Sequence, residues 1–345
     1  MKFDRKKHSA ELRQRVGESR ISSALEYIRR KKGYAGEQHE PYDIRPFIHR
    51  IILSGSRRCC EGSYQILFDA FGGFIKDPTF EPEKRMPKYE DKWIRTTKEF
   101  QINAFIDPLK YYFPFFLLEI NTHDASPEDL KSFLHSTDLK LPGLLISSAD
   151  YTLDIFCNDS LAAQCLFAEF MRHLHIPYQR GGKLTGDDLM TWGSNTMNAA
   201  FRIGQAQFYE RGPDRKKEGD AWHIKDVDRV RLEYTAWRRI FQKKGISTLR
   251  DFIKRPKFYD INKGLYNFRH FIHSRKLPKF FEDYKHADPN TSLESLHLEL
   301  KHHRGTTKNI NQYLHIMRAF NPLREDLLTA MKDFDRDWRG YSIKE

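Results

Sequence analysis

Four short segments between residues 115 and 235 constrain the fold most strongly, because each alternates apolar and polar side chains at the period of a β-strand. They are LLEIN (117–121), ADYTLDIF (149–156), AQFYERG (206–212) and RVRLEY (229–234). Successive side chains of a strand point to opposite faces, so each segment can bury one face and keep the other polar. In the second segment, Asp150 and Asp154 share a face. We expect a sheet whose polar face carries carboxylates.

The segments between these strands predict helices, and the first helix has a clear start. Ser126 is a suitable N-cap, Pro127 fits the first turn because it needs no donor there, and Asp129 completes an S-x-x-D capping pattern. A second helix is expected over residues 159–175. The order β-α-β-α-β-β predicts an α+β fold, mainly an antiparallel sheet with helices packed on one face.

The rest of the chain divides around this region. Residues 1–100 are expected to form a basic, mostly helical N-terminal region. Residues 254–345 predict a helical C-terminal region, suited to DNA recognition or dimerisation. Residues 76–98 are rich in proline and charge, which predicts a linker or extended loop. Residues 101–253 then form the domain that carries the polar strands.

The charge of the chain favours a polyanionic partner. Lys and Arg number 59 against 47 Asp and Glu, a formal net charge of +12 at pH 7, and such an excess promotes nucleic-acid binding through counterion release. The most apolar stretch, residues 111–120, is too short to span a bilayer, and the charged N-terminus does not read as a cleavable signal. Four cysteines without a CxxC pair predict no disulfide framework and no metal pair. We therefore expect a cytoplasmic protein with no membrane partner.

The polar strand faces offer carboxylate ligands for a divalent cation, namely Glu119, Asp150, Asp154 and Glu233. A hard cation such as Mg²⁺ or Mn²⁺ compensates the charge of a phosphodiester during its cleavage. Asp150 and Asp154 are four strand residues apart, about 13 Å at ~3.3 Å per residue, so one ion can reach only one of them unless the strand bulges. Asp154 is the preferred ligand.

Ordinary structural roles remain open for three of these carboxylates and for Tyr209. Asp154 and Glu233 could be solvent-facing strand residues or partners of Arg229 and Arg231, and Glu119 could pair with a nearby base. Tyr209, in the AQFYERG segment, could be a buried aromatic residue with a hydrogen-bonded hydroxyl.

Several motifs follow one another in a recognisable order. LLEIN precedes the capped helix SPEDLKSFL, and SADYTLDIF (148–156), TWGSNT (191–196), QFYERG (207–212), RVRLEY and GISTLRDF (245–252) follow. The region 115–252 thereby resembles the catalytic domain of the trans-acting Rep proteins, rolling-circle replication initiators of small plasmids and some phages that include related conjugative relaxases. Their motifs are R-I-E-F-N, R-L-D-L-A-x-D-F, Y-x-G-S-R-x-S, R-I-Y-[ND]-K and R-V-E-x-E-L. Ser148 replaces the arginine of the second motif, Arg231 replaces the first glutamate of the last, and the interval between TWGS and FYERG is longer than usual.

The resemblance implies a metal-dependent enzyme that nicks and rejoins DNA. Tyr209 matches the family's nucleophile, which forms a 5′-phosphotyrosine, and Arg211 matches the lysine after it, where a cation can steady charge on the phosphate. It also implies Mg²⁺ or Mn²⁺ as cofactor and a Rep/relaxase-like nicking domain over residues 101–253. The implied partners are a replication origin with a single-stranded or hairpin nick site, a host helicase and a second copy in a homodimer.

Three other functions fit the same residues. A basic DNA- or RNA-binding protein without nuclease activity would use the carboxylates only structurally. A metal-dependent nuclease that uses water would need the carboxylates but not Tyr209. A conjugative relaxase would share the chemistry of the replication initiators, so the sequence does not separate these two. Divalent-metal dependence together with a covalent adduct with DNA separates the tyrosine enzymes from the binding protein, which cannot form an adduct.

Overall fold

The computed structural model describes residues 42–82, 89–123, 125–157, 204–210, 229–271 and 321–343, together with short pieces between 162 and 192 and residues 314–316. The strands are β1 (Tyr42–Gly55), β2 (Ile75–Lys76), β3 (Tyr89–Thr96), β4 (Phe100–Pro108), β5 (Phe116–Thr122), β6 (Leu145–Cys157), β7 (Leu174–His175), β8 (Lys183–Leu184), β9 (Leu189–Trp192), β10 (Gly204–Glu210), β11 (Arg229–Trp237), β12 (Asn267–Phe271) and β13 (Leu314–Ile316). The helices are the 3₁₀ turn η1 (Arg57–Cys60), α3 (Tyr64–Phe71), α4 (Pro127–Lys140), α7 (Arg238–Lys243), α8 (Leu249–Lys254), α9 (Phe258–Asn262) and α11 (Asn321–Gly340).

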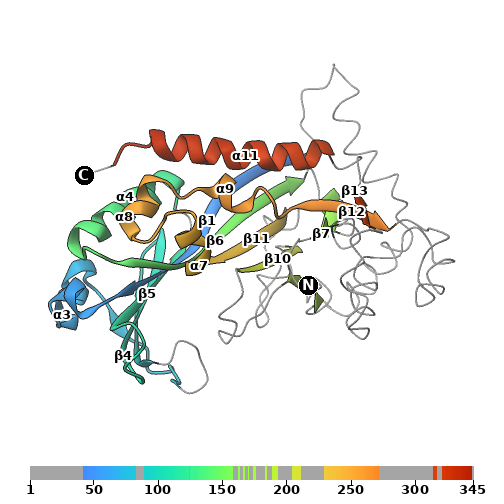
Figure 1. Ribbon diagram of the computed structural model, residues 1–345. Helices are drawn as coiled ribbons and strands as arrows, with labels where there is room; N and C mark the ends of the chain where they lie inside the picture. The colour runs from blue at the N-terminus through green and yellow to red at the C-terminus, as the bar shows by residue number, and fades with distance from the viewer. Residues whose placement is uncertain are drawn as a thin grey trace. The chain divides into compact units, whose positions relative to one another are not determined.

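A large sheet dominates the fold (Figure 1). Its strand order is β2-β3-β4-β5-β1-β6-β11-β10-β9-β8, and a small sheet has the order β13-β12-β7. The pairings of β1 with β5, β3 with β4, β4 with β5 and β9 with β10 are all antiparallel. The expected α+β class with a mainly antiparallel sheet is therefore confirmed at this level. The four strands predicted from alternation correspond to β5, β6, β10 and β11.

The described residues fall into two compact units. The first comprises Pro46–Thr152, Thr235–Ile261 and Met331–Glu345, and the second includes the described residues of Leu153–Tyr234 and Asn262–Ala330. The predicted division of the chain into residues 1–100, 101–253 and 254–345 stays a prediction.

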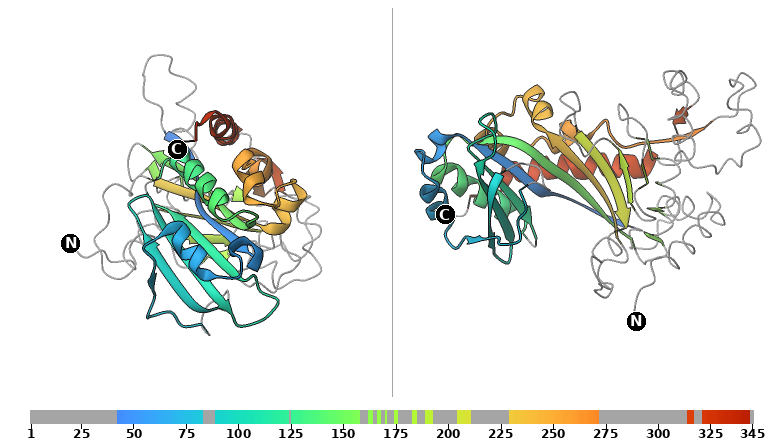
Figure 2. Two further views of the ribbon diagram at one scale, coloured as in Figure 1. Left: turned by 90° about the vertical axis from the view of Figure 1, so that its left-hand side faces the viewer. Right: turned by 90° about the horizontal axis from the view of Figure 1, so that it is seen from below.

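In the first unit, helices cover one face of the sheet. Tyr151 of β6 packs against Phe241 and Phe258, with ring centroids 6.2 and 4.9 Å away, and its hydroxyl donates to the carbonyl of Pro256. The indole of Trp338 donates to the carbonyl of Ile253 at 2.8 Å. Figure 2 shows α4 and α8 lying together over these strands. Aromatic burial of this kind leaves the opposite sheet face for polar residues.

The start of α4 forms as the sequence predicts. The Ser126 hydroxyl accepts from the Asp129 amide at 3.1 Å, and the Asp129 carboxylate accepts from the Ser126 amide at 3.3 Å, with Pro127 in the first turn. Further along the helix, Phe133 stacks on Phe100 of β4 with ring centroids 4.5 Å apart. The capping box thus fixes where α4 begins, and the apolar face fixes where it packs.

The second unit has its own aromatic core. Phe208 of β10 contacts Phe167 and Phe170, and Phe170 contacts Phe268 of β12, with ring centroids 5.1 to 5.9 Å apart. All four side chains are at most 2% exposed. Most of the helix expected over residues 159–175 lies outside the described residues.

Two predictions about the N-terminal hundred residues are wrong where the structure describes them. The expected helical region contains the 14-residue strand β1, and its residues 1–41 lie outside the described residues. The expected linker at 76–98 contains β3, which pairs with β4 along its whole length. Its charged residues do not mark a loop, because Lys92 pairs with Asp77 at 3.0 Å and Lys76 with Asp91 at 2.7 Å across neighbouring segments.

The helical prediction for residues 254–345 holds for α11 but not for residues 267–271, which form β12. Within the described ranges, none of the helices combines the length and apolar character required to cross a membrane.

Candidate functional site

The polar face of the first unit is built from β4, β5, β1 and β6. On β5, Leu118 and Ile120 are fully buried toward the helices, so Glu119 and Asn121 point to the other side. Glu119 lies opposite Asn103 of β4 and Ile52 of β1 in the strand register. A regular antiparallel register therefore brings side chains from three strands around one carboxylate.

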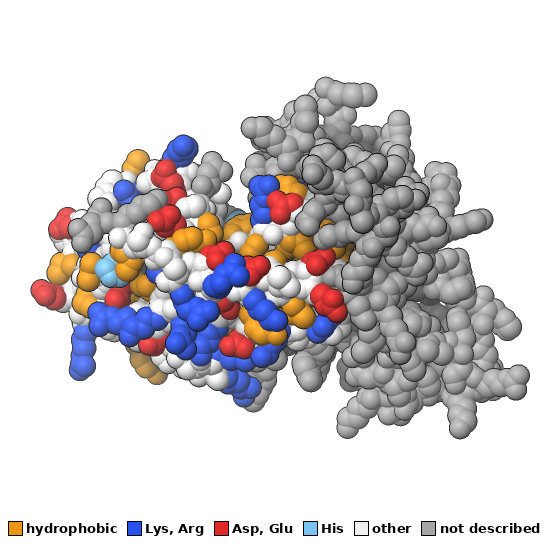
Figure 3. All heavy atoms as spheres, turned by 90° about the horizontal axis from the view of Figure 1, so that it is seen from above, with side chains coloured by type: hydrophobic (Ala, Val, Ile, Leu, Met, Phe, Trp, Pro, Cys, Tyr) orange, Lys and Arg blue, Asp and Glu red, His pale blue; other side chains and the backbone are white. Residues whose placement is uncertain are grey.

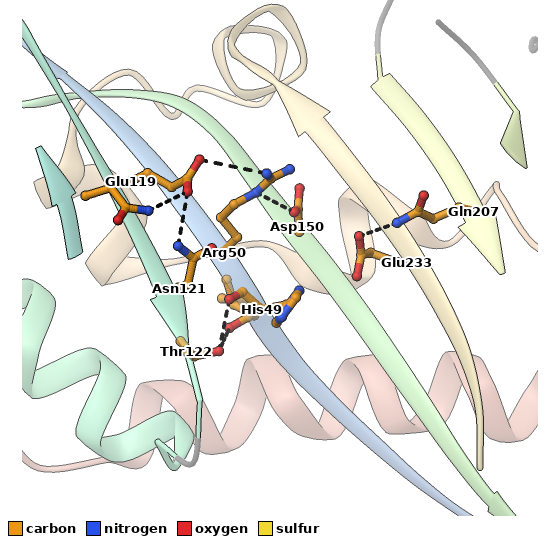
Figure 4. Close-up of polar contacts among 10 residues, drawn as sticks. His49, Arg50, Glu119, Asn121, Thr122, Asp150, Gln207 and Glu233 are labelled. Atoms are coloured by element: carbon orange, nitrogen blue, oxygen red, sulfur yellow. Dashed lines mark hydrogen bonds and ion pairs between the residues drawn. The ribbon is translucent and has the colours of Figure 1, made fainter. Parts of the chain in front are cut away.

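Glu119 is held by two amides and a guanidinium (Figure 4). Its Oε1 atom accepts hydrogen bonds from the side-chain amides of Asn103 at 2.9 Å and Asn121 at 3.1 Å, and its Oε2 atom lies 3.9 Å from Arg50. The structural role expected for Glu119, pairing with a nearby basic residue, is thus present with Arg50. Its expected role as a metal ligand stays a prediction.

Arg50 links Glu119 to Asp150 of β6. The Arg50 Nε atom donates to Asp150 at 2.8 Å, and the Asp150 side chain is 2% exposed while that of Arg50 is 36% exposed. Charge-assisted bonds of this length are the stronger class of hydrogen bond in proteins. Sequence reasoning missed Arg50 because it lies in a segment that was expected to be helical.

β1 departs from regular alternation beside this cluster. Ile48 and Ile51 are 1% and 0% exposed although they are three residues apart, and the Thr122 hydroxyl bonds to the carbonyls of both Ile48 (2.9 Å) and His49 (3.0 Å). Two buried residues at this spacing indicate a β-bulge, which directs two consecutive side chains, His49 and Arg50, to one face. No sequence signal marks such a bulge.

His49 thereby becomes a candidate metal ligand that the sequence did not reveal. One of its ring nitrogens and a carboxylate oxygen of Asp150 lie within 4.8 Å of each other, close enough for both to contact one ion. Imidazole and carboxylate together suit Mn²⁺ and other divalent cations.

Thr152 lies two residues along β6 from Asp150, on the same face of the strand. Its side chain is 0% exposed, and its hydroxyl makes no hydrogen bond to any described residue. A buried hydroxyl without a partner costs stability. A ligand bound beside Asp150 would remove that cost.

Asp154, in the second unit, is surrounded by arginines. Arg231 of β11 donates to both of its carboxylate oxygens at 2.6 and 2.8 Å, and Arg229 donates to Oδ2 at 2.9 Å. Asp154 and Arg231 are each 3% exposed. The ion-pair alternative expected for Asp154 is therefore present, while its role as a metal ligand stays a prediction.

Glu233 lies on β11 and Tyr209 on β10. The Glu233 carboxylate accepts from the side-chain amide of Gln207 of β10 at 2.7 Å, and Glu233 is 5% exposed. The backbone of Tyr209 pairs with Leu189 of β9, but the Tyr209 side chain and the whole of Arg211 lie outside the described residues. The predicted roles of Tyr209, Arg211 and Glu233 stay predictions.

Two other tyrosines near Glu233 are poorly suited to attack a phosphate. Tyr234 and Tyr266 are 1% and 4% exposed. Burial raises the pKa of both hydroxyls well above its ordinary value, and the nearby Tyr234 and Glu233 raise that of Tyr266 further. A nucleophilic oxygen must be accessible and must lose its proton, so neither tyrosine is suited to that role.

No known protein-family model matches the chain. No curated protein matches it either.

Proposed function

We propose that this protein is a rolling-circle replication initiator, which nicks and rejoins DNA at a replication origin through a covalent bond between Tyr209 and a 5′-phosphate. The strand order carries the proposal. β10, which bears Tyr209, is next to β11, which bears Glu233, and β11 is next to β6, which bears Asp150. A nucleophile and two candidate metal ligands on three adjacent strands are what such chemistry requires.

The residues that would hold the cation are Asp150 and His49 of the first unit. The proximity of the His49 ring to the Asp150 carboxylate supports this set, and so does the buried hydroxyl of Thr152, which has no partner among the described residues. A bound Mg²⁺ or Mn²⁺ would supply charge compensation at the scissile phosphate.

The chain's own residues would carry the covalent step. The Tyr209 oxygen attacks the phosphorus, the bond from phosphorus to the 3′ oxygen breaks, and the tyrosine proton is lost while the departing 3′ oxygen gains one. The products are a 5′-phosphotyrosine and a free 3′-hydroxyl that can prime synthesis. Attack by a 3′-hydroxyl on the phosphotyrosine reverses the step and rejoins a strand, so no nucleotide cofactor is needed. Arg211 is proposed to stabilise charge on the phosphate.

A covalent adduct tests the proposal. The protein is incubated with Mn²⁺ and labelled single-stranded DNA from the genetic element that encodes it, and a denaturing gel is examined for DNA that migrates with the protein. We expect an adduct in the wild type and in Tyr111→Phe, whose tyrosine is 98% exposed, and none in Tyr209→Phe. Cleavage that survives Tyr209→Phe would refute the tyrosine mechanism, and binding without cleavage would favour a non-catalytic binding protein.

Metal binding needs a readout that does not depend on cleavage. Electron paramagnetic resonance measures free Mn²⁺ during titration of the full chain, and we expect Asp150→Asn and His49→Ala each to weaken Mn²⁺ binding by at least tenfold. Glu90→Gln, an exposed carboxylate on β3, is the matched control and should bind as the wild type does. Unchanged binding in both site variants would refute this ligand set.

A further inference from the structure

A strongly basic surface lies on the α7–α8 segment, residues 238–257. The segment holds eight Lys and Arg residues and one acid, a formal charge of +7 against +12 for the whole chain. Figure 3 shows blue Lys and Arg side chains gathered along the lower edge of the helical face. Charge at this density attracts polyanions.

The segment is anchored within the first unit by buried side chains and a backbone hydrogen bond. Phe241, Leu249 and Phe252 are fully buried, and the connection between the helices pairs with the start of β6 through Leu249, whose amide donates to the Leu144 carbonyl at 2.8 Å. The cations therefore sit on a fixed surface.

The single acid of the segment does not neutralise this charge. Asp251 accepts from the amides of Ser247 and Thr248 and from the Thr248 hydroxyl, at 2.9 to 3.1 Å, as the N3 residue of the α8 capping box. These bonds lower its pKa, the Thr248 amide most, so it stays ionised but directed to the backbone. Of the cations, Arg250 pairs with Asp138 at 3.0 Å. The exposed cations for which no hydrogen bond or ion pair to a described residue is found are Arg238, Lys243, Lys254 and Arg255.

The kind of polyanion follows from the aromatic residues. The aromatic residues of the segment, Phe241 and Phe252, are 0% exposed, so they cannot stack on unpaired bases, the main source of affinity for single strands. What the segment presents outward is cationic. Such a surface fits phosphates that a rigid double helix holds at regular spacing.

We propose that α7 and α8 contact the phosphate backbone of duplex DNA, through Arg238, Lys243, Lys254 and Arg255. The inference rests on the proposed function only in the choice of DNA as the partner, because it needs neither Tyr209 nor a metal. It assigns the segment to positioning the protein on duplex DNA rather than to reading bases.

The test is the salt dependence of binding to a duplex that contains no nick site. Fluorescence anisotropy of the labelled duplex is followed with the full chain between 50 and 200 mM KCl. The test variant replaces Arg238, Lys243, Lys254 and Arg255 with Gln, and the control replaces Arg57, Arg58, Lys98 and Lys110, which are also exposed cations of the same unit. The charge lost is the same in both variants, so a difference in salt dependence reports on where the charge lies.

Each phosphate contact contributes about 0.9 to the slope of log K against log salt. The slope of the test variant should therefore be smaller in magnitude by about 3 to 4. Between 50 and 200 mM KCl, its affinity should fall by a factor about 150 times smaller than that of the wild type. The control should keep the wild-type slope. Equal slopes in wild type and test variant, or equal losses in both variants, would overturn the proposal, and so would stronger binding to anionic lipid vesicles than to the duplex.

This outcome is separable from that of the nicking experiment. If the wild type forms no adduct but the four-residue variant shows the expected loss of salt slope, the tyrosine chemistry is refuted and the duplex surface stands. A normal adduct with an unchanged slope in the test variant refutes the duplex surface alone. Circular dichroism and thermal melting establish that each variant is folded.

Discussion

Replacing Asp154 with asparagine separates a structural ion pair from a metal ligand. The substitution preserves the size of the side chain and removes its charge. If Asp154 serves to neutralise Arg229 and Arg231, the folded protein loses stability and still binds Mn²⁺. If Asp154 is a metal ligand, Mn²⁺ binding falls whatever happens to stability.

The expected loss of stability follows from the three hydrogen bonds at Asp154, which are 2.6, 2.8 and 2.9 Å long. Asparagine retains one acceptor oxygen but turns an amide N–H group toward a guanidinium that is itself a donor. Removing one partner of a buried ion pair costs about 3–5 kcal/mol, because the remaining charge stays buried without compensation. For a domain of about 150–250 residues, this corresponds to a melting temperature lower by roughly 6–20 °C.

Urea denaturation followed by circular dichroism measures the change, and Asp43→Asn is the matched control. Asp43 also pairs with an arginine, Arg45, at 2.6 Å, but the two side chains are 57% and 66% exposed. Exposed pairs contribute about 0–1 kcal/mol, so this variant should unfold almost as the wild type does. Equal midpoints for Asp154→Asn and Asp43→Asn would refute the reasoning from burial.

Three further predictions concern stability. Trp338→Phe removes the donor to the Ile253 carbonyl and should cost about 1–3 kcal/mol in urea denaturation; an unchanged midpoint would mean that the indole bond contributes nothing. Gly55→Ala should cost about 1–3 kcal/mol by the same measurement, because the Phe116 ring occupies the position that a Cβ atom would take, and a neutral effect would show that the ring moves freely. The pKa of Asp251 lies below its ordinary value of 3.8, so its stabilising effect is present above that pH and lost as the pH falls through the lower folded-state pKa. Asp251→Asn should flatten the dependence of the urea midpoint on pH below about 4, and a curve parallel to that of the wild type would contradict this.

The sequence was sufficient where a local rule decides the structure. Alternation predicted β5, β6, β10 and β11 because one face of each strand meets an apolar layer. The capping pattern predicted the start of α4 because its hydrogen bonds are made within four residues, from Ser126 to Asp129.

The sequence was insufficient where residues far apart in the chain determine the local structure. Pairing partners such as Lys92 and Asp77 make a charged segment into a strand, and composition alone cannot reveal a partner on a neighbouring segment. The bulge that brings His49 and Arg50 to one face depends on the burial of both Ile48 and Ile51. Such a choice follows from packing, not from the identity of the residues involved.

The burial of the arginines that bond to Asp154 and Asp150 decides which of these two aspartates is better suited to bind a metal ion. The sequence favoured Asp154, yet both of its oxygens accept from arginines, and the side chains of Arg229 and Arg231 are only 11% and 4% exposed. A cation there would have to displace a buried guanidinium, which would then lie in a low-dielectric interior beside an added positive charge. The Arg50 side chain, which bonds to Asp150, is 36% exposed, so it can turn toward solvent at small cost. With His49 close by and the Thr152 hydroxyl buried on the same strand face, Asp150 is therefore better placed than Asp154 to be the carboxylate ligand of the proposed divalent ion.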